Sequence, residues 1–393
     1  MTVTEVVFCI CIGALLLTYV VYPGALGVAL MLGRPRPPLL VVSDTRPPVT
    51  LLIPVHNAAR RIIPKLVNTL QTSYPINKLY IMVGLDGCTD GTHEAVQQFT
   101  THNHFVRILE NKGRIGKSAL LNCMVEAAET DLLVITDVDA LLEPGTLELL
   151  VTALADVAVG IASSDLVAVK PNDSSVAKAE SLYAGLEQMT KQAEGAWWGV
   201  CMGAFGPCYA IRKRAYGRIP TGFIGDDLFI TLSALQKDYR STLVRGATCR
   251  LSVAGNALDE FDRKARIAAG SYQNMGYWLP RLFQLPFAAS LAFFVHKVLR
   301  WLGPLWLLGI LVTSFLAALY EQLLGALWPI QLGCMLLAGG VLLQRQGFRY
   351  MGPLNRIGHF YAMHIAMAVG FFRYATGRIK PFWEPTARTS ISR

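Results

Sequence analysis

Residues 49–136 alternate between short apolar runs and longer stretches in which apolar residues recur every three or four positions. The apolar runs have the length of buried strands, and the stretches between them have the spacing of amphipathic helices. The expected elements are strands at 49–55, 79–85, 105–109 and 131–136, and helices at 58–72, 91–99 and 116–128. Strands that alternate with helices predict an α/β domain with a doubly wound, mostly parallel sheet.

Long apolar segments lie on both sides of this domain. Residues 6–32, 301–320 and 322–344 contain no Asp, Glu, Lys or Arg. Each is long enough to cross a bilayer, which takes about 20 apolar residues, so all three are predicted transmembrane helices. The first has no basic residue before it and no clear cleavage site, which favours an uncleaved anchor over a signal peptide. Two further apolar segments, 282–295 and 357–372, are short for a span, and we expect the first to lie at the membrane surface.

The composition agrees with a membrane protein, since 53% of the residues are hydrophobic and 16% are charged, against about 25% charged in soluble domains. The net charge is +9, but the Lys and Arg residues gather beside the apolar segments, which is typical of the positive-inside rule and not of nucleic-acid binding. We therefore expect a multi-pass protein of the plasma (inner) membrane, with three or five spans and with the globular domain and the C-terminus in the cytoplasm. The 8 Cys residues include no C-x-x-C pair, and we interpret them as core residues.

Polar residues follow each of the four predicted strands. His56 and Asn57 come after the first strand, residues 86–91 after the second, residues 111–113 after the third and residues 137–139 after the fourth. Taken singly, each Asp in this set could be a helix N-cap or a turn residue. Because ligands of such sheets bind beyond the carboxyl ends of the strands, the set together predicts a ligand site at that edge.

Six segments in chain order resemble the inverting family 2 glycosyltransferases, which have the GT-A fold. They are Ile-Pro-Val-His-Asn at 53–57, Asp-Gly-Cys-Thr-Asp-Gly-Thr at 86–92, Gly-Lys-Ser-Ala-Leu-Leu-Asn at 116–122, Thr-Asp-Val-Asp-Ala at 136–140, Gly-Asp-Asp at 225–227, and the segment 263–270. The apolar segments on both sides fit the membrane-bound, polysaccharide synthase-like branch. With these segments the chain divides into an anchor at 1–33, a Pro-rich linker at 34–48, a catalytic domain at 49–276, an interfacial segment at 277–300, a transmembrane region at 301–376 and a basic tail at 377–393.

The resemblance implies a nucleotide-sugar donor and a divalent cation. It assigns donor binding to Pro54, Asn57, Asp86, Lys117, Asp137, Arg263 and Arg266. It assigns the cation, Mg²⁺ or Mn²⁺, to Asp139 together with Asp137, the two acids of the D-x-D motif. The chemistry calls for such groups, because a departing diphosphate develops negative charge that a cation neutralises, and both cations prefer oxygen ligands.

By the same resemblance Asp227 is the general base that deprotonates the acceptor hydroxyl, and Asp226 is its acidic partner. Inverting transfer needs one such carboxylate, and two adjacent carboxylates are expected to raise each other's pKa. The other interpretation of this pair is an N-cap and a first-turn acid on a helix at 228–235.

The acceptor is expected to be a lipid-linked sugar or an oligosaccharide, in polysaccharide or glycolipid synthesis. Trp197 and Trp198 are candidate acceptor residues because sugar rings pack on aromatic faces, although they could equally be core or interfacial aromatics. Arg263 and Ile267 stand where processive synthases carry the Gln and Trp of Gln-x-x-Arg-Trp, so we expect a hexosyltransferase that adds one or a few sugars. Ala58 stands where the family usually has a glutamate.

Other functions are open at this point: a processive polysaccharide synthase, a polyprenyl-phosphate sugar transferase, or an inactive transferase-like scaffold. The segment 113–118 also looks like part of a phosphate-binding P-loop. That motif needs a glycine at the position held by Asn111, so a P-loop NTPase is disfavoured.

Overall fold

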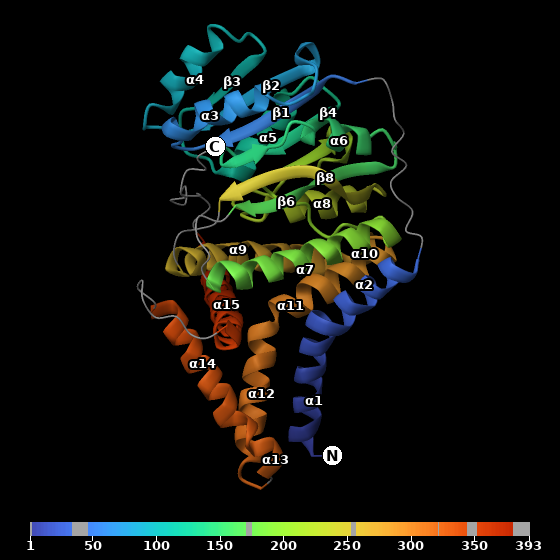
Figure 1. Cartoon of the computed structure of the whole chain (residues 1–393), viewed down its shortest axis with the longest axis vertical. Helices are drawn as coiled ribbons and strands as arrows, with labels where there is room; N and C mark the ends of the chain where they lie inside the picture. The colour runs from blue at the N-terminus through green and yellow to red at the C-terminus, as the bar shows by residue number, and fades with distance from the viewer. Residues whose placement is uncertain are drawn as a thin grey trace.

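The computed structural model describes residues 2–33, 46–169, 175–252, 257–320, 322–343 and 352–379. Three parts follow one another along the longest axis (Figure 1): an α/β domain, a set of helices that lie across the axis, and a stalk of helices that includes the N-terminal helix. The predicted linker lies outside the described residues up to position 45, and the predicted basic tail does so from position 380.

The α/β domain is built on one mixed sheet with the strand order β3-β2-β1-β4-β7-β6-β8-β5. Its strands are β1 Val49–Val55, β2 Leu79–Asp86, β3 Val106–Asn111, β4 Leu132–Thr136, β5 Ala140–Leu142, β6 Val159–Val169, β7 Cys208–Arg212 and β8 Arg240–Ser252. The first four strands are parallel, as the alternation of strands and helices predicts. The second half differs, because β7 runs antiparallel to both β4 and β6, and β5 runs antiparallel to β8.

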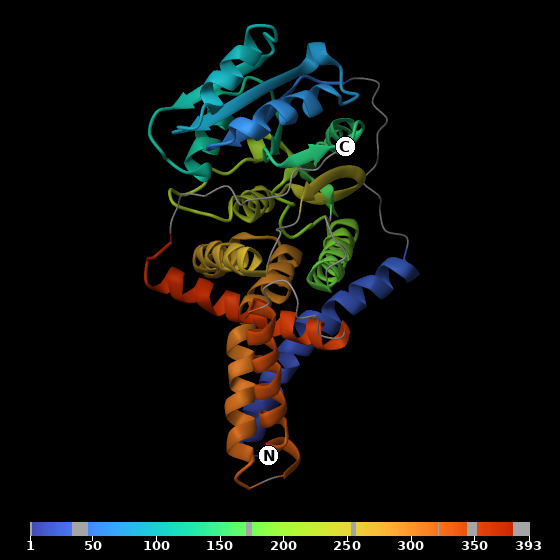
Figure 2. The same ribbon diagram turned by 60° about the vertical axis from the view of Figure 1, so that its left-hand side comes forward.

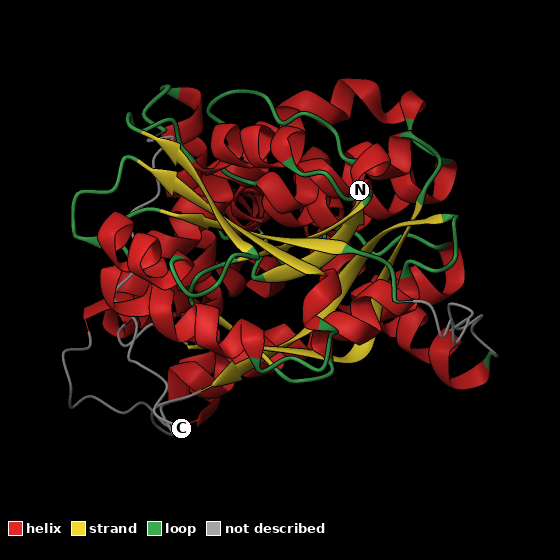
Figure 3. Cartoon of the chain, turned by 90° about the horizontal axis from the view of Figure 1, so that it is seen from above, coloured by secondary structure: helices red, strands yellow, loops and turns green. Residues whose placement is uncertain are grey.

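Helices cover both faces of the sheet, which is seen from above in Figure 3. The helices of this domain are α3 Ala59–Leu70, α4 Thr92–Thr100, α5 Lys117–Ala127, α6 Thr146–Ala153 and α8 Asp226–Gln236, with short 3₁₀ turns at Ile76–Lys78 and Lys213–Ala215. Leu51 and Ile53 of β1 pack into the same core as α3, α4 and α6, whereas Leu52 packs with α5 and α8. Every residue of β1 is therefore buried, which is why its sequence is a continuous apolar run.

The helices outside this domain are α1 Val3–Leu16, η1 Leu17–Val21, α2 Tyr22–Leu32, α7 Ser175–Trp198, α9 Ala257–Trp278, η4 Leu279–Gln284, α10 Phe287–Ala292, η5 Phe293–Val298, α11 Leu299–Trp301, α12 Gly303–Ala317, α13 Gln322–Gly325, α14 Leu327–Leu343 and α15 Gly352–Ala375. Within the described parts of the chain, one helix, Val3–Leu32, is long and apolar enough to cross a membrane. A second qualifies only if Phe287–Trp301 and Gly303–Ala317, which meet at a bend of 55°, form one span. The predicted spans at 301–320 and 322–344 therefore stay predictions.

The two short apolar segments of the prediction belong to different kinds of element. The segment at 282–295 covers the end of a 3₁₀ turn, α10 and the start of the π-helical η5, and its predicted place at the membrane surface stays a prediction. The segment at 357–372 belongs to the longer helix α15, which packs against α9 and α14. In Figure 2, α15 lies across the long axis, between the sheet domain and the stalk.

The cysteines only partly fit the interpretation as core residues. Cys11, Cys201, Cys208 and Cys249 are buried, whereas Cys9 and Cys123 are exposed.

Candidate active site

The carboxyl ends of β1, β2 and β4 meet at one edge of the sheet, where the polar motif residues gather. Asp86 ends β2, and its carboxylate accepts hydrogen bonds from the backbone amides of Ile115 (2.7 Å) and Gly116 (3.0 Å). The side chain of Asp86 is fully buried. Asp86 therefore fixes the loop that leads into α5, and its predicted contact with the donor's base or ribose stays a prediction.

The loop after β1 is held in place by the loop after β2. Asn57 has a positive φ of 47°, a conformation that Asn tolerates better than most residues, and its side-chain oxygen accepts a hydrogen bond from the amide of Thr89 (2.9 Å). The Nδ1 atom of His56 lies 2.6 Å from the carbonyl oxygen of Asp86. These two contacts join the ends of β1 and β2 into one rim. Pro54 lies inside β1 and is buried there.

The D-x-D acids follow β4, and each of them pairs with a cation. Asp139 forms an ion pair with Arg61 at 2.6 Å, and Asp137 forms one with Lys117 at 3.0 Å. Lys65 lies underneath, fully buried, and donates a hydrogen bond to the hydroxyl of Thr136 (3.0 Å). Sequence reasoning missed Arg61 and Lys65. The signal that could have found them is their i, i+4 spacing on α3, with Lys65 at a position of its apolar face.

Lys117 connects the D-x-D acids with the acidic pair at the start of α8. Its ammonium group lies 3.0 Å from Asp137 and 3.2 Å from Asp226. Burial alone would lower the pKa of Lys117, yet the carboxylates of Asp137 and Asp226 raise that pKa above the ordinary lysine value. Burial is also the main reason why the pKa of Asp226 is raised, while Lys117 counteracts this rise. The lysine therefore stays charged and lies between the two carboxyl groups.

The residues present fit a divalent cation. Asp137 and Asp139 offer carboxylate oxygens, and Mg²⁺ or Mn²⁺ commonly takes one or two carboxylates and completes its shell with water and substrate phosphate. No group of three or more His, Cys, Asp or Glu side chains that could hold a metal lies within the described ranges. A cation at this rim would share Asp139 with Arg61, whose guanidinium lies 2.6 Å from that carboxylate.

The adjacent residues Asp226 and Asp227 face different surroundings at the start of α8. Asp226 is 5% exposed and pairs with Lys117, whereas the partly exposed Asp227 lines a cavity of about 470 Å³. The amide of Leu228 donates to Asp227 Oδ1 at 2.8 Å, as expected for a first-turn acid. A methyl group at Gly206 would lie 3.1 Å from Asp227 Oδ2, so glycine leaves room for this carboxylate.

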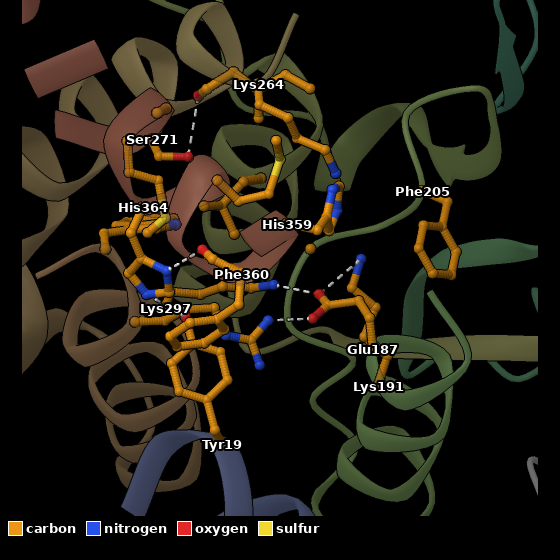
Figure 4. A pocket seen from close by; sticks show the side chains of 18 of the residues that line it. Tyr19, Glu187, Lys191, Phe205, Lys264, Ser271, Lys297, His359, Phe360 and His364 are labelled. Carbon is orange, nitrogen blue, oxygen red and sulfur yellow. Dashed lines mark hydrogen bonds and ion pairs between the residues drawn. The ribbon is translucent and has the colours of Figure 1, made fainter. Parts of the chain in front are cut away.

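The cavity, shown from close by in Figure 4, is lined by residues of the α/β domain and of the helices outside it. Besides Asp227, its lining includes Lys191, Phe205, Lys264 and Ile267. Ile267 is the residue that replaces the aromatic ring of the processive synthases, so the substitution falls on the cavity wall. The lining also includes residues of η1, η5, α11 and α15, which sequence reasoning did not connect with the site.

Four predicted site residues belong neither to the residues described above nor to this lining, which among the predicted residues includes Asp227 alone. Arg263 forms hydrogen bonds with Glu260 at 2.9 and 2.6 Å, and neither it nor Arg266 is among the lining residues. Trp197 and Trp198 end α7; Trp198 packs near Tyr22 of α2, with ring centroids 6.2 Å apart. Neither tryptophan lines the cavity, and their predicted acceptor role stays a prediction.

Residues 50–219 match the family model described as Glycosyl transferase family 2, so the chain contains a glycosyltransferase family 2 domain. Two curated relatives come from Haloferax volcanii. Glycosyltransferase AglE is 26% identical over 146 residues, which cover 37% of this chain and 48% of that protein. Glycosyltransferase AglD is 30% identical over 126 residues, which cover 30% of this chain and 20% of that protein. The matches thus span less than half of either relative.

The fold is GT-A-like. It is similar to that of the mannosyltransferase PcManGT from Pyrobaculum calidifontis, solved in complex with GDP-Man and Mn²⁺, with a TM-score of 0.70. The two chains are 22% identical, and the match covers 95% of this chain and 98% of that one.

Proposed function

We propose that this protein is an inverting glycosyltransferase that transfers a hexose from a nucleotide sugar to a lipid-linked or oligosaccharide acceptor at the cytoplasmic face of the membrane. The observation that carries the proposal is that the two adjacent acids at the start of α8 contact different groups. Asp226 is tied through Lys117 to the D-x-D rim, while Asp227 faces the cavity. The first turn of α8 thereby contacts, through Lys117, the D-x-D acids proposed to bind the donor, and it also lines the cavity proposed to hold the acceptor.

The proposed reaction is a single displacement. The acceptor oxygen attacks the anomeric carbon, the bond from that carbon to the diphosphate oxygen breaks, and the acceptor's proton passes to Asp227. The Oδ1 atom already accepts from the Leu228 amide, so Oδ2 is the atom that takes the proton. A divalent cation at Asp137 and Asp139 would neutralise charge on the departing diphosphate.

The membrane placement rests on the apolar helix Val3–Leu32 and on the bent pair that ends in α12. The cavity lies beside these elements, since Tyr19 of the N-terminal helix and Trp301 of α11 both line it. An acceptor anchored in a bilayer would therefore reach Asp227 without leaving the membrane surface.

The test is a screen of radiolabelled UDP- and GDP-sugars with purified protein and membrane lipid extract. We expect one donor to be consumed and its label to appear on a lipid or glycan, with inverted anomeric configuration. A protein that neither hydrolyses nor transfers from any donor would be the inactive scaffold. A lipid-linked monosaccharide as the only product would show the polyprenyl-phosphate sugar transferase, and a long polymer would show the processive synthase.

A further inference from the structure

The cavity beside Asp227 carries an excess of positive charge. Five Lys or Arg side chains line it against two carboxylates. These residues are the cations Lys191, Lys264, Lys297, Arg300 and Arg356 and the acids Glu187 and Asp227. Charges in a partly dry cavity are costly unless they are paired. The lining is therefore suited to a ligand that brings negative charge of its own.

Most of this charge is concentrated around one acid, Glu187 (Figure 4). Its carboxylate forms ion pairs with Lys297 at 2.7 Å, with Arg300, and with Lys191 at 3.7 Å. The Nε2 atom of His296 lies 3.0 Å away. Burial alone would raise the pKa of Glu187, but Lys297, His296 and Arg300 hold it well below the usual range. One carboxylate thus faces three basic side chains and a histidine.

Lys191 shows that the cluster is short of negative charge. Its side chain is almost fully buried, and its ammonium group sits 3.8 Å from the centre of the Phe205 ring. Burial, with a further contribution from Lys297, lowers the pKa of Lys191. An anion bound next to this ammonium group would raise that pKa again.

Most of the remaining wall of the cavity is apolar, although Ser271, His359 and His364 also belong to it. Ile267, Trp301, Phe360, Met363 and Met367 contribute to it, together with the ring of Tyr19 from the N-terminal apolar helix. A free inorganic anion would leave this surface unused. A ligand with an anionic group next to an apolar chain would cover both parts of the lining.

The order of these features along the molecule indicates how such a ligand would lie. Asp227 belongs to α8 of the sheet domain, the cations Lys297 and Arg300 belong to η5 and α11, and the stalk follows beyond them. A sugar joined through phosphate to an apolar chain has its parts in the same order. Its hydroxyl would reach Asp227 while its phosphate lies among the cations.

Resting on the proposed function, we propose that the cavity binds the phosphate of an acceptor glycolipid in which phosphate links the sugar to an apolar chain. Lys264, Lys297 and Arg300 are the residues that hold this phosphate. The acceptor is thus selected by its charged linkage as well as by its sugar.

The experiment measures binding to the full-length protein in detergent micelles, followed by tryptophan fluorescence, since Trp301 lines the cavity. The probes are a short-chain polyprenyl phosphate, the corresponding free alcohol and inorganic phosphate. We expect the lipid phosphate to bind about 10–100-fold more tightly than the alcohol, the range for losing hydrogen bonds between charged groups. Equal affinity for the alcohol, or for inorganic phosphate, would overturn the proposal.

Variants then locate the phosphate. Arg300→Gln and Lys264→Gln are each expected to weaken lipid-phosphate binding at least about tenfold, whereas Glu187→Gln removes a competing carboxylate and should strengthen it. Arg214→Gln is the matched control, because Arg214 is exposed on the 3₁₀ turn after β7, and it should change nothing. If Arg300→Gln fails to fold, Lys264, whose side chain is 20% exposed, still gives a decisive result. Unchanged affinity in Lys264→Gln, or a loss in Glu187→Gln, would contradict the proposal.

Donor binding in the same preparations separates this inference from the proposed function. Retained binding of a UDP- or GDP-sugar together with unchanged lipid affinity in the variants would reject the phosphate site alone. Absence of donor binding in the unmodified protein would reject the proposed function itself.

Discussion

Replacing Lys117 by Met should destabilise the protein in a pH-dependent way. The ammonium group of Lys117 lies 3.0 Å from Asp137 and 3.2 Å from Asp226, and methionine keeps the length of the side chain while removing its charge. Asp226 is almost fully buried, so the variant leaves a carboxylate with little water to solvate it. Removing one partner of a buried ion pair leaves the other charge without compensation. The experiment measures the resulting loss in the free energy of unfolding.

The size of the stability loss expected for Lys117→Met follows from the burial of Lys117, Asp137 and Asp226. Loss of one partner of a buried pair typically costs about 3–5 kcal/mol. The Asp137 side chain is 34% exposed, so water screens its share and we expect about 2–3 kcal/mol in total at neutral pH. For a domain of this size each kcal/mol lowers Tm by roughly 2–4 °C, which gives a shift of about 5–10 °C.

The sign of the pH dependence comes from Asp226. Its native pKa is raised above the ordinary value of 3.8, so the native state holds this proton more tightly than the unfolded chain does. The cost of charging Asp226 therefore appears as pH rises through the native pKa and is complete above it. Removing Lys117 raises the native pKa further, so the deficit of the variant is largest at neutral pH and shrinks on acidification.

The assay is thermal unfolding of the detergent-solubilised protein between pH 5 and pH 8. Lys213→Met is the matched control, because Lys213 donates to the backbone carbonyl oxygens of Glu126 and Ala128, groups that do not titrate. Its effect should not change with pH. The double variant Lys117→Met with Asp226→Asn should recover most of the lost stability. A Tm deficit in Lys117→Met that is the same at pH 5 and pH 8 would refute this reasoning.

Three further predictions concern catalysis and topology. Asp227→Asn should lower transfer about 10²–10⁴-fold while donor affinity, measured by equilibrium binding, is unchanged; an active Asp227→Asn with an inactive Asp226→Asn would reverse the assignment. EDTA and Asp139→Ala should each abolish transfer, and full turnover in EDTA would contradict a metal at this rim. A reporter fused after Arg393 should be active only as a cytosolic reporter, and alkaline phosphatase activity there would place the C-terminus outside.

The sequence predicts well those elements whose own residues show a strand or helix pattern of apolar positions. The strand predicted at 49–55 coincides with β1, and the helix predicted at 116–128 differs from α5 (Lys117–Ala127) by one residue at each end. Both faces of β1 are buried, so its apolar run has no polar interruption. The antiparallel β7 was not predicted, because its place depends on pairing with β4 and β6, which local patterns do not contain.

The same reasoning explains which parts of the site were missed. The acids at the strand ends follow from the rule that parallel strands present their carboxyl ends at one edge. The cluster around Glu187 follows from no local rule, because Lys297 and Arg300 are 110 and 113 residues away in the chain. Arg61 was missed for a different reason, since an arginine in the first turn of a helix is ordinarily a surface residue.

The different surroundings of the adjacent residues Asp226 and Asp227 connect the proposed donor site with the proposed acceptor site. Successive residues of a helix point about 100° apart, so adjacent carboxylates at the start of α8 enter different surroundings without any strain in the backbone. Lys117 contacts Asp226 on one side and Asp137 on the other. A diphosphate and a cation bound at Asp137 would change the net charge around Lys117. This change would alter the pKa of Asp226, which is adjacent to the proposed base Asp227. We therefore expect occupancy of the donor site to alter the pH dependence of transfer through Lys117, an effect that Lys117→Met would remove.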